Sequence, residues 1–145
     1  MSKVSIYLNF TRNTEEAFLF YKSVFGTEFI GDIARMGDVP SPEEGGPTLS
    51  EEDKNLVMHV ALPLYENCVL MGTDAPESMG FTVNKGNNVY INLEPDTTDE
   101  ADRVFALLSE GGNVGMPLQK MFWGAYFGSC TDKFGVQWMV NCEQG

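Results

Sequence analysis

The sequence predicts an α+β fold made of two copies of one βαβββ module. Two segments, Ile6–Phe10 and residues 89–93, alternate in the pattern apolar-Tyr-apolar-Asn-apolar, which is typical of a half-buried strand. Each segment is followed by a helix start, at residues 14–17 and 98–101, and the two copies keep the same spacing to within one residue. A strand and a helix that recur together at one spacing indicate an internal repeat.

Each predicted helix carries one apolar stripe with the i, i+3, i+4, i+7 spacing of a buried helix face. The stripes are Ala17, Phe20, Tyr21 and Val24 in the first helix, and Ala101, Val104, Phe105 and Leu108 in the second. Each helix begins with a pair of residues at capping-box spacing, Asn13 with Glu16 in the first and Thr97 with Glu100 in the second. Glycines end the helices, at Gly26 in the first and at Gly111 and Gly112 in the second. The start, the stripe and the stop of the two helices therefore agree.

Three further strands are expected after each helix. They cover residues 28–35, 55–62 and 68–72 in the first module, and residues 113–121, 123–131 and 136–142 in the second. Turn-forming residues separate the last two strands of each module, at 63–67 and 132–135. The chain is then one domain of residues 1–145, with module one at roughly 1–76, a linker at roughly 77–87 and module two at roughly 88–145.

Residues 37–53 interrupt the periodic pattern. This stretch is rich in proline and glycine and holds six acidic residues. One interpretation is a solvated connection between strands. The other is a lid over a site, because long loops in compact domains are sometimes functional.

The composition excludes several classes of function. The net charge of −12 disfavours nucleic acid and anionic membrane surfaces, both of which require clustered Lys and Arg. No apolar run approaches the roughly 18 residues of a membrane span, and the first three residues lead straight into a strand-like segment without a signal peptide. Cys68, Cys130 and Cys142 form no C-x-x-C motif, so reduced thiols and a cytoplasmic location are expected.

Strand alternation separates the polar residues of the two first strands from the apolar ones. The apolar residues would face the helix of each module, whereas Tyr7 and Asn9 in one copy, and Tyr90, Asn92 and Glu94 in the other, would point away from it. Two such sheets, each covered by a helix on one side, could curl so that their polar faces enclose a cleft.

An aromatic cluster in the second module is a further candidate for the lining of this cleft. It comprises Phe122, Trp123, Tyr126, Phe127 and Trp138. Trp123 and Tyr126 have polar tips and are the better ligand-binding candidates, whereas Phe127 and Trp138 are expected in the core. The complete set of predicted ligand-binding residues is Tyr7, Asn9, Tyr90, Asn92, Trp123 and Tyr126.

Four stretches of the chain resemble the PhnB-like branch of the vicinal oxygen chelate superfamily, which includes glyoxalase I, extradiol dioxygenases and bleomycin-resistance proteins. They are AFLFYKSVFG at 17–26, VMHV at 57–60, VLMGTDAP at 69–76, and FWG at 122–124 followed by DKFGVQW at 132–138. The resemblance implies a glyoxalase-like fold of paired βαβββ modules, commonly a homodimer, with a pocket inside U-shaped sheets. Some members of this branch are labelled methyltransferases, but the sequence has no glycine-rich loop of the adenosylmethionine type.

The resemblance also implies where a metal would bind, because the enzymes of the superfamily hold a divalent ion with His and Glu on the first and last strands of each module. Carried onto this chain, those positions fall at Ile6 or Tyr7, near Met71, at Val89 or Tyr90, and near Met139. None is a usual ligand for such an ion. We therefore expect no metal site and no cofactor.

Three functions remain open. The first, which the missing metal ligands favour, is metal-independent binding of a small, partly aromatic or amphipathic ligand. The second is a metal-dependent enzyme of the lyase, isomerase or dioxygenase type, with His59, the only histidine, and Glu94 as catalytic candidates. The third is a dimeric interaction module without a small ligand.

Overall fold

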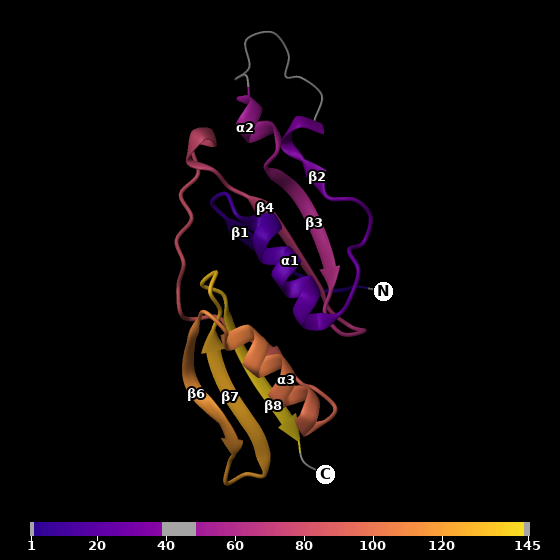
Figure 1. Ribbon diagram of the computed structural model, residues 1–145, viewed down its shortest axis with the longest axis vertical. Helices are drawn as coiled ribbons and strands as arrows, with labels where there is room; N and C mark the ends of the chain where they lie inside the picture. Colours follow the sequence, from indigo (N-terminus) through magenta and orange to yellow (C-terminus); the bar gives the residue numbers. More distant parts are fainter. Residues whose placement is uncertain (1, 39–48, 144–145) are drawn as a thin grey trace. The chain divides into compact units, whose positions relative to one another are not determined.

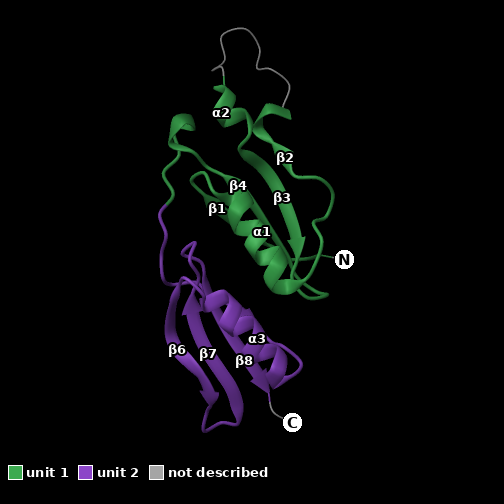
Figure 2. Ribbon diagram, viewed as in Figure 1, with its two compact units in different colours: residues 1–83 green, residues 84–145 purple. Residues whose placement is uncertain are grey.

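The computed structural model describes residues 2–38 and 49–143 (Figure 1). The chain divides into two compact units, Met1–Val83 and Asn84–Gly145, which we call unit 1 and unit 2 (Figure 2). The boundary between them lies within the predicted linker at 77–87. No helix in the described part of the chain has the length and apolar character needed to cross a membrane.

Unit 1 contains a four-stranded sheet in the order β1-β4-β3-β2. Its elements are β1 (Ile6–Phe10), α1 (Thr14–Phe25), β2 (Ala34–Arg35), the 3-10 turn η1 (Met36–Asp38), α2 (Glu51–Lys54), β3 (Val57–Pro63), β4 (Val69–Asp74) and the 3-10 turn η2 (Glu77–Met79). Strand β1 runs parallel to β4, and the other neighbours are antiparallel.

Unit 2 repeats this topology with the strand order β5-β8-β7-β6. Its elements are β5 (Ile91–Leu93), α3 (Thr98–Ser109), β6 (Asn113–Lys120), β7 (Ala125–Thr131) and β8 (Gln137–Glu143). The first and last strands, β5 and β8, are again parallel, and the remaining pairs are antiparallel. The predicted α+β fold of two βαβββ modules is therefore confirmed.

One helix covers one face of each sheet (Figure 1). In unit 1 the side chains of Phe18, Tyr21 and Leu70 are completely buried between α1 and the sheet. Phe18 lies so close to β4 that a β-carbon at Gly72 would be 2.5 Å from its ring, which explains the glycine there. Phe20, predicted in the buried stripe, is only half-buried, and Phe18 takes that place.

Three predicted strands start later than expected, and a glycine at positive φ accounts for two of these shifts. The strand expected at 28–35 is reduced to Ala34–Arg35, and Gly31 has a φ of +71° that an extended strand does not allow. The strand expected from residue 123 begins at Ala125, because Gly124 forms a turn with a φ of +97°. The strand expected from residue 89 begins at Ile91. Val89 lies outside the ladder, and its carbonyl accepts a hydrogen bond from the Gln137 side chain at 3.0 Å.

The two helices begin differently, which corrects one of the two predicted capping boxes. In α3 the Thr97 hydroxyl accepts a hydrogen bond from the Glu100 amide at 3.1 Å, as predicted. In α1 the Asn13 side chain makes no capping bond. Instead the Asp74 carboxylate, at the end of β4, accepts hydrogen bonds from the amide and hydroxyl of Thr14, at 3.0 and 2.7 Å. A tertiary contact therefore replaces the local cap.

Asp74 also reaches the beginning of β3. Its second carboxylate oxygen accepts a hydrogen bond from the Val57 amide at 2.8 Å, and the side chain is only 3% exposed. One buried carboxylate thus joins the start of α1, the start of β3 and the end of β4. Its negative charge at the first turn of α1 also complements the helix dipole.

The Asp132 carboxylate has a similar part in unit 2. It is 3% exposed and accepts hydrogen bonds from the amides of Phe134 and Val136, at 2.8 and 3.1 Å. Its second oxygen accepts a hydrogen bond from the indole N–H of Trp138 at 2.8 Å. The predicted turn at 132–135 is thereby confirmed, and it is fastened to the largest buried side chain of the unit.

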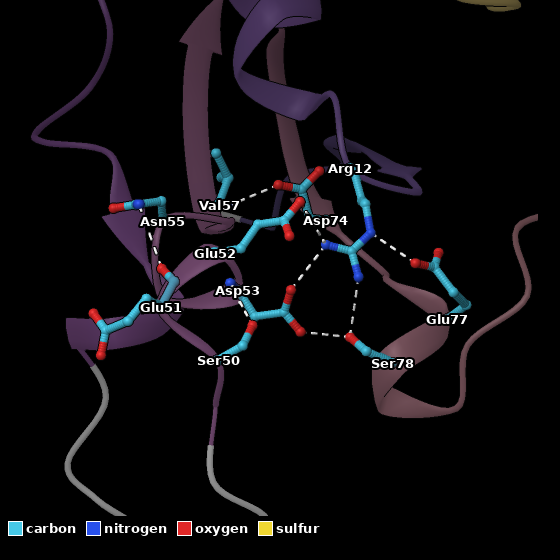
Figure 3. Close-up of polar contacts among 10 residues, drawn as sticks. All are labelled: Arg12, Ser50, Glu51, Glu52, Asp53, Asn55, Val57, Asp74, Glu77 and Ser78. Atoms are coloured by element: carbon cyan, nitrogen blue, oxygen red, sulfur yellow. Dashed lines mark hydrogen bonds and ion pairs between the residues drawn. The ribbon is translucent and has the colours of Figure 1, made fainter.

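Arg12 joins α2, at the end of the acidic stretch 37–53, to the 3-10 turn η2 (Figure 3). The guanidinium donates to Asp53 in α2 at 2.8 Å and to Glu77 in η2 at 2.7 Å, and the Ser78 hydroxyl donates to Asp53 at 2.6 Å. The hydrogen bonds from Ser78 and Arg12 lower the pKa of Asp53. Residues 39–48, on which the lid interpretation depends, lie outside the described residues.

We expect Asp74→Ala to lower the free energy of unfolding by about 3 kcal/mol, because it leaves three donors without an acceptor in a buried place. Urea denaturation measures this change. Asp32→Ala, which removes an exposed carboxylate of the same unit, should change the free energy by less than about 0.5 kcal/mol. Equal effects of the two substitutions would show that Asp74 does not join these elements.

Candidate functional site

Each sheet has one face that its helix does not cover, and the strand registers determine which side chains lie there. In unit 1 Tyr7 lies opposite Met71, Asn9 lies opposite Thr73, and Met71 also lies opposite Ala61 of β3. His59 is two residues from Ala61 and therefore shares its side of the strand. We call these six residues, Tyr7, Asn9, His59, Ala61, Met71 and Thr73, the helix-free face of unit 1.

Tyr7 and His59 form the chemically most versatile pair on this face. The Tyr7 hydroxyl lies 3.3 Å from His59 Nδ1, and the ring centroids are 5.9 Å apart. Tyr7 is 49% exposed. Since the hydrogen can lie on either atom, the pair can donate a proton to a bound molecule or accept one. When His59 is neutral, none of the six side chains carries a charge.

The helix-free face of unit 2 holds amides, thioethers and one aromatic ring. Asn92 and Ser129 lie opposite Met139, Phe127 lies opposite Asn141, and Gln119 and Met116 of β6 lie opposite Phe127 and Ser129. The face so defined comprises Asn92, Met116, Gln119, Phe127, Ser129, Met139 and Asn141. Asn141 Oδ1 is buried and has no hydrogen-bond partner among the described residues.

Two more aromatic rings adjoin this face at the turn between β6 and β7. Phe122 is 97% exposed and Trp123 is 55% exposed. Trp123 stands at 4.9 Å from Phe122 and at 6.3 Å from Phe127, measured between ring centroids, with an edge-to-face geometry in both pairs. The turn is fixed by hydrogen bonds from the Met121 amide to Ala125 and from the Gly124 amide to Met121.

The structure separates Tyr126 from the other predicted ligand-binding residues. Its ring points to the helix side of the sheet, where the hydroxyl donates a hydrogen bond to Asp102 of α3 at 2.5 Å. This hydrogen bond raises the pKa of Tyr126. Trp138 also lies on the helix side and is completely buried, as predicted. Phe127, predicted in the core, lies instead on the helix-free face and is half-buried.

The remaining predicted residues are distributed between the units. Tyr7, Asn9 and His59 lie together in unit 1, and Asn92 lies on the helix-free face of unit 2. Tyr90 and Glu94 flank β5 at its two ends, where Tyr90 is 39% exposed. The two catalytic candidates, His59 and Glu94, therefore belong to different units. The cleft between the sheets stays a prediction.

The side chains at the strand positions that hold metal ions in the superfamily do not fit such an ion. Met71 faces Tyr7, and Met139 faces Asn92, two residues beyond the predicted position at Tyr90. Two thioethers and a phenol, with a single amide oxygen and no carboxylate or imidazole, make a poor donor set for a hard or borderline divalent ion. Within residues 2–38 and 49–143, moreover, no three His, Cys, Asp or Glu side chains gather as a metal site requires.

Sequence reasoning missed Gln119, Asn141 and the placement of Phe127. Tyr126 and Phe127 are adjacent aromatic residues, so strand alternation puts them on opposite faces without saying which faces the helix. The register of β7 against β8, which pairs Gly128 with Val140 on the helix side, decides it. Gly128, which follows the aromatic pair and lies on the same side of the strand as Tyr126, was the one available signal in the sequence.

The pKa of Tyr126 gives a test of its position. Asp102→Asn should lower this pKa toward the ordinary value of about 10, because the carboxylate that holds the proton is lost. The folded protein holds this proton more tightly than the unfolded chain. The contact therefore stabilises the fold below pH of about 10, and that stabilisation is lost as the pH rises through the raised pKa.

Nuclear magnetic resonance titration of labelled tyrosines measures this pKa, and Tyr126→Phe assigns the signal among the five tyrosines. Asp99→Asn, on the same helix, is the control and should leave the titration unchanged. An unaltered pKa in the Asp102 variant would contradict the hydrogen bond.

A family model described as 3-demethylubiquinone-9 3-methyltransferase matches residues 2–141 of the chain. Protein YjdN of Escherichia coli K12 is 28% identical over 146 residues, which cover 95% of this chain and 93% of YjdN.

Solved structures show the same relationship. Protein PA1353 from Pseudomonas aeruginosa is 36% identical over the whole of both chains, with a TM-score of 0.82. The PhnB protein from Bacillus cereus is 28% identical over 97% of this chain and 99% of its own, with a TM-score of 0.72. A glyoxalase/bleomycin resistance protein/dioxygenase family enzyme from Burkholderia phytofirmans is 18% identical over 99% and 100% of the two chains. Its TM-score of 0.64 shows a common fold alone.

Proposed function

Because the chain belongs to the 3-demethylubiquinone-9 3-methyltransferase family, whose PhnB-like members have the glyoxalase fold, we propose that it binds a small ligand on its helix-free sheet faces without a resident metal ion. One observation carries the proposal. The strand positions to which the superfamily resemblance assigns metal ligands hold Tyr7 against Met71 in unit 1, and Tyr90, just before β5, and Met139 in unit 2. These side chains can contact and hydrogen-bond an organic molecule but are poor ligands for the metal.

The charge of the two faces supports an uncharged ligand. The chain carries a net charge of −12, yet the thirteen side chains that define the two helix-free faces include no Asp, Glu, Lys or Arg, and Glu143 follows on the same side only at the end of β8. Small-molecule sites are typically apolar surfaces with a few placed hydrogen-bonding groups. Hydroxyl, amide and thioether groups on a sheet match that description, and an anion would gain no ion pair from them.

The methyltransferase in the family description is not part of this proposal. Methyl transfer from adenosylmethionine usually requires a glycine-rich loop for the cofactor, and the sequence contains none of that type. The description applies to the family, and the side chains assembled on the two faces of this chain favour binding.

We expect a ligand-observed magnetic resonance screen of uncharged metabolites to find compounds that bind equally well in the presence of EDTA and of added Mn²⁺. Asn9→Ala or Asn92→Ala should lower the affinity for such a compound about fivefold, which is the effect of one lost hydrogen bond. Asp32→Ala, outside both faces, serves as the matched control. Binding that disappears with the chelator would disprove a metal-independent site.

A second candidate function is acid–base catalysis in unit 1, and the Tyr7–His59 contact favours it. A phenol and an imidazole 3.3 Å apart on a partly exposed face can exchange a proton with a bound molecule without a metal. The sequence suggested His59 and Glu94 as the catalytic pair. We propose Tyr7 and His59 in their place, because these two residues share one sheet.

This candidate predicts chemical conversion, or exchange of a carbon-bound proton for deuterium, when a compound that binds is incubated with the protein in D₂O. His59→Gln should slow the conversion by about 100-fold and Tyr7→Phe by a similar factor, as for other positioned acids and bases. Proton resonance spectra of the compound measure the rate, and Asp32→Ala, outside both helix-free faces, is the control. If every bound compound stays unchanged for days, binding alone is the function.

A further inference from the structure

We propose that the helix-free face of unit 2 is a subsite for a planar, uncharged nitrogen heterocycle with a free N–H group. The ligand stacks on Phe127 and Trp123, and the side-chain amides of Gln119 and Asn141 contact its edge. This inference rests on the proposed binding function and names the chemical class of the ligand.

The aromatic rings at the turn between β6 and β7 are exposed to an unusual degree. A short turn normally carries polar residues, whereas this one presents Phe122 and Trp123 with exposed fractions of 97% and 55%. Hydrogen bonds from the amides of Met121 and Gly124, at 2.8 and 2.9 Å, keep the turn in shape. The indole is therefore held in place and is available for stacking.

The edge-to-face contacts continue from this turn onto the sheet. Trp123 lies between Phe122 and Phe127, and its ring is inclined by 61° to that of Phe127. A flat molecule placed against one of these rings meets the edge or the face of the next. Such contacts between rings are more favourable than burial of the same area alone.

Two amides flank the ring of Phe127. The strand register places Gln119 of β6 directly opposite it on one side, and Asn141 of β8 directly opposite it on the other. Cross-strand neighbours on one face have their β-carbons about 5 Å apart. A ring stacked on Phe127 is thus within reach of an amide on either side.

Asn141 lacks a hydrogen-bond donor for its side-chain oxygen among the described residues, and a ligand could supply that donor. Its Oδ1 atom is buried and accepts no hydrogen bond from any described residue. A buried acceptor without a donor is costly, so such an oxygen in a functional place suggests a donor from outside the chain. The terminal torsion of asparagine is soft, and the amide can turn toward a ligand N–H with little strain.

The surrounding charge excludes anionic ligands. The ring and its two flanking amides are uncharged, and Glu143, opposite Ala125 at the end of β8, is two residues from Asn141 on the same side of the sheet. An anion bound here would be repelled by Glu143 and by the net charge of −12. An uncharged ring with an N–H donor satisfies Asn141 without that repulsion.

Carbostyril, a flat bicyclic lactam, is a suitable probe because it carries one N–H group beside a carbonyl. The chain has two tryptophans, of which Trp123 lies in the proposed subsite and Trp138 is completely buried on the helix side. We expect carbostyril to quench the emission of Trp123 saturably, and Trp123→Phe to leave a Trp138 emission that does not respond.

Matched compounds and variants test each contact separately, with affinities measured by calorimetry. N-Methylcarbostyril, which lacks the donor, should bind about fivefold more weakly, and Gln119→Ala should have a similar effect. Phe127→Leu should lower the affinity for carbostyril about tenfold. Phe81→Leu, at an exposed phenylalanine of unit 1, should leave this affinity unchanged. Valerolactam, which has the same amide without the aromatic ring, should not bind measurably.

The inference would be overturned if carbostyril left Trp123 emission unchanged up to its solubility limit. Equal affinities for carbostyril and its N-methyl form, or for the native protein and the Gln119 and Phe127 variants, would overturn it as well. Metabolites that bind in the screen without affecting Trp123 would sink this inference and leave the proposed function standing. A screen without any bound metabolite would instead disprove the proposed function.

Discussion

The buried carboxylate of Asp74 is the contact on which the architecture of unit 1 depends. It accepts hydrogen bonds from Thr14 at the start of α1 and from Val57 at the start of β3, while its own backbone ends β4. A single charge out of contact with water is stable only because these donors surround it. The helix is thereby fixed over one face of the sheet, and the other face becomes available for the pair of Tyr7 and His59.

The two units share a strand order, a covering helix and a buried carboxylate, but their helix-free faces carry different side chains. In unit 2 another buried carboxylate, Asp132, fastens the last turn to Trp138 through hydrogen bonds of 2.8 Å from Phe134 and from the indole. Both units have the same strand order and one covering helix. Their helix-free faces differ, because unit 1 presents a phenol with an imidazole and unit 2 presents an aromatic ring between two amides. The repeated scaffold therefore supports two different sets of contacts.

Local patterns predicted most of the fold. The helices α1 and α3 begin where the sequence indicated, at Thr14 and Thr98, because their stripes and stops are encoded within a dozen residues. The predictions that were wrong concern features that depend on residues far away in the sequence or on backbone conformation. Asp74 caps α1 from sixty residues away, and no local pattern could have replaced Asn13 with it. Glycines at positive φ shortened two strands, since alternation of residue types does not reveal backbone conformation.

The sequence by itself determined that this chain is a repeat of two βαβββ modules and that Tyr7, Asn9 and Asn92 point away from the helices. It also placed no His, Asp or Glu at the strand positions to which the superfamily resemblance assigns metal ligands. These properties depend on residue identity and on periods of two and about 3.6 residues. Only the tertiary structure paired Tyr7 with His59, turned Tyr126 to Asp102, and set Phe127 between Gln119 and Asn141. The physical reason is strand register, because a shift of one residue exchanges the two faces of a sheet.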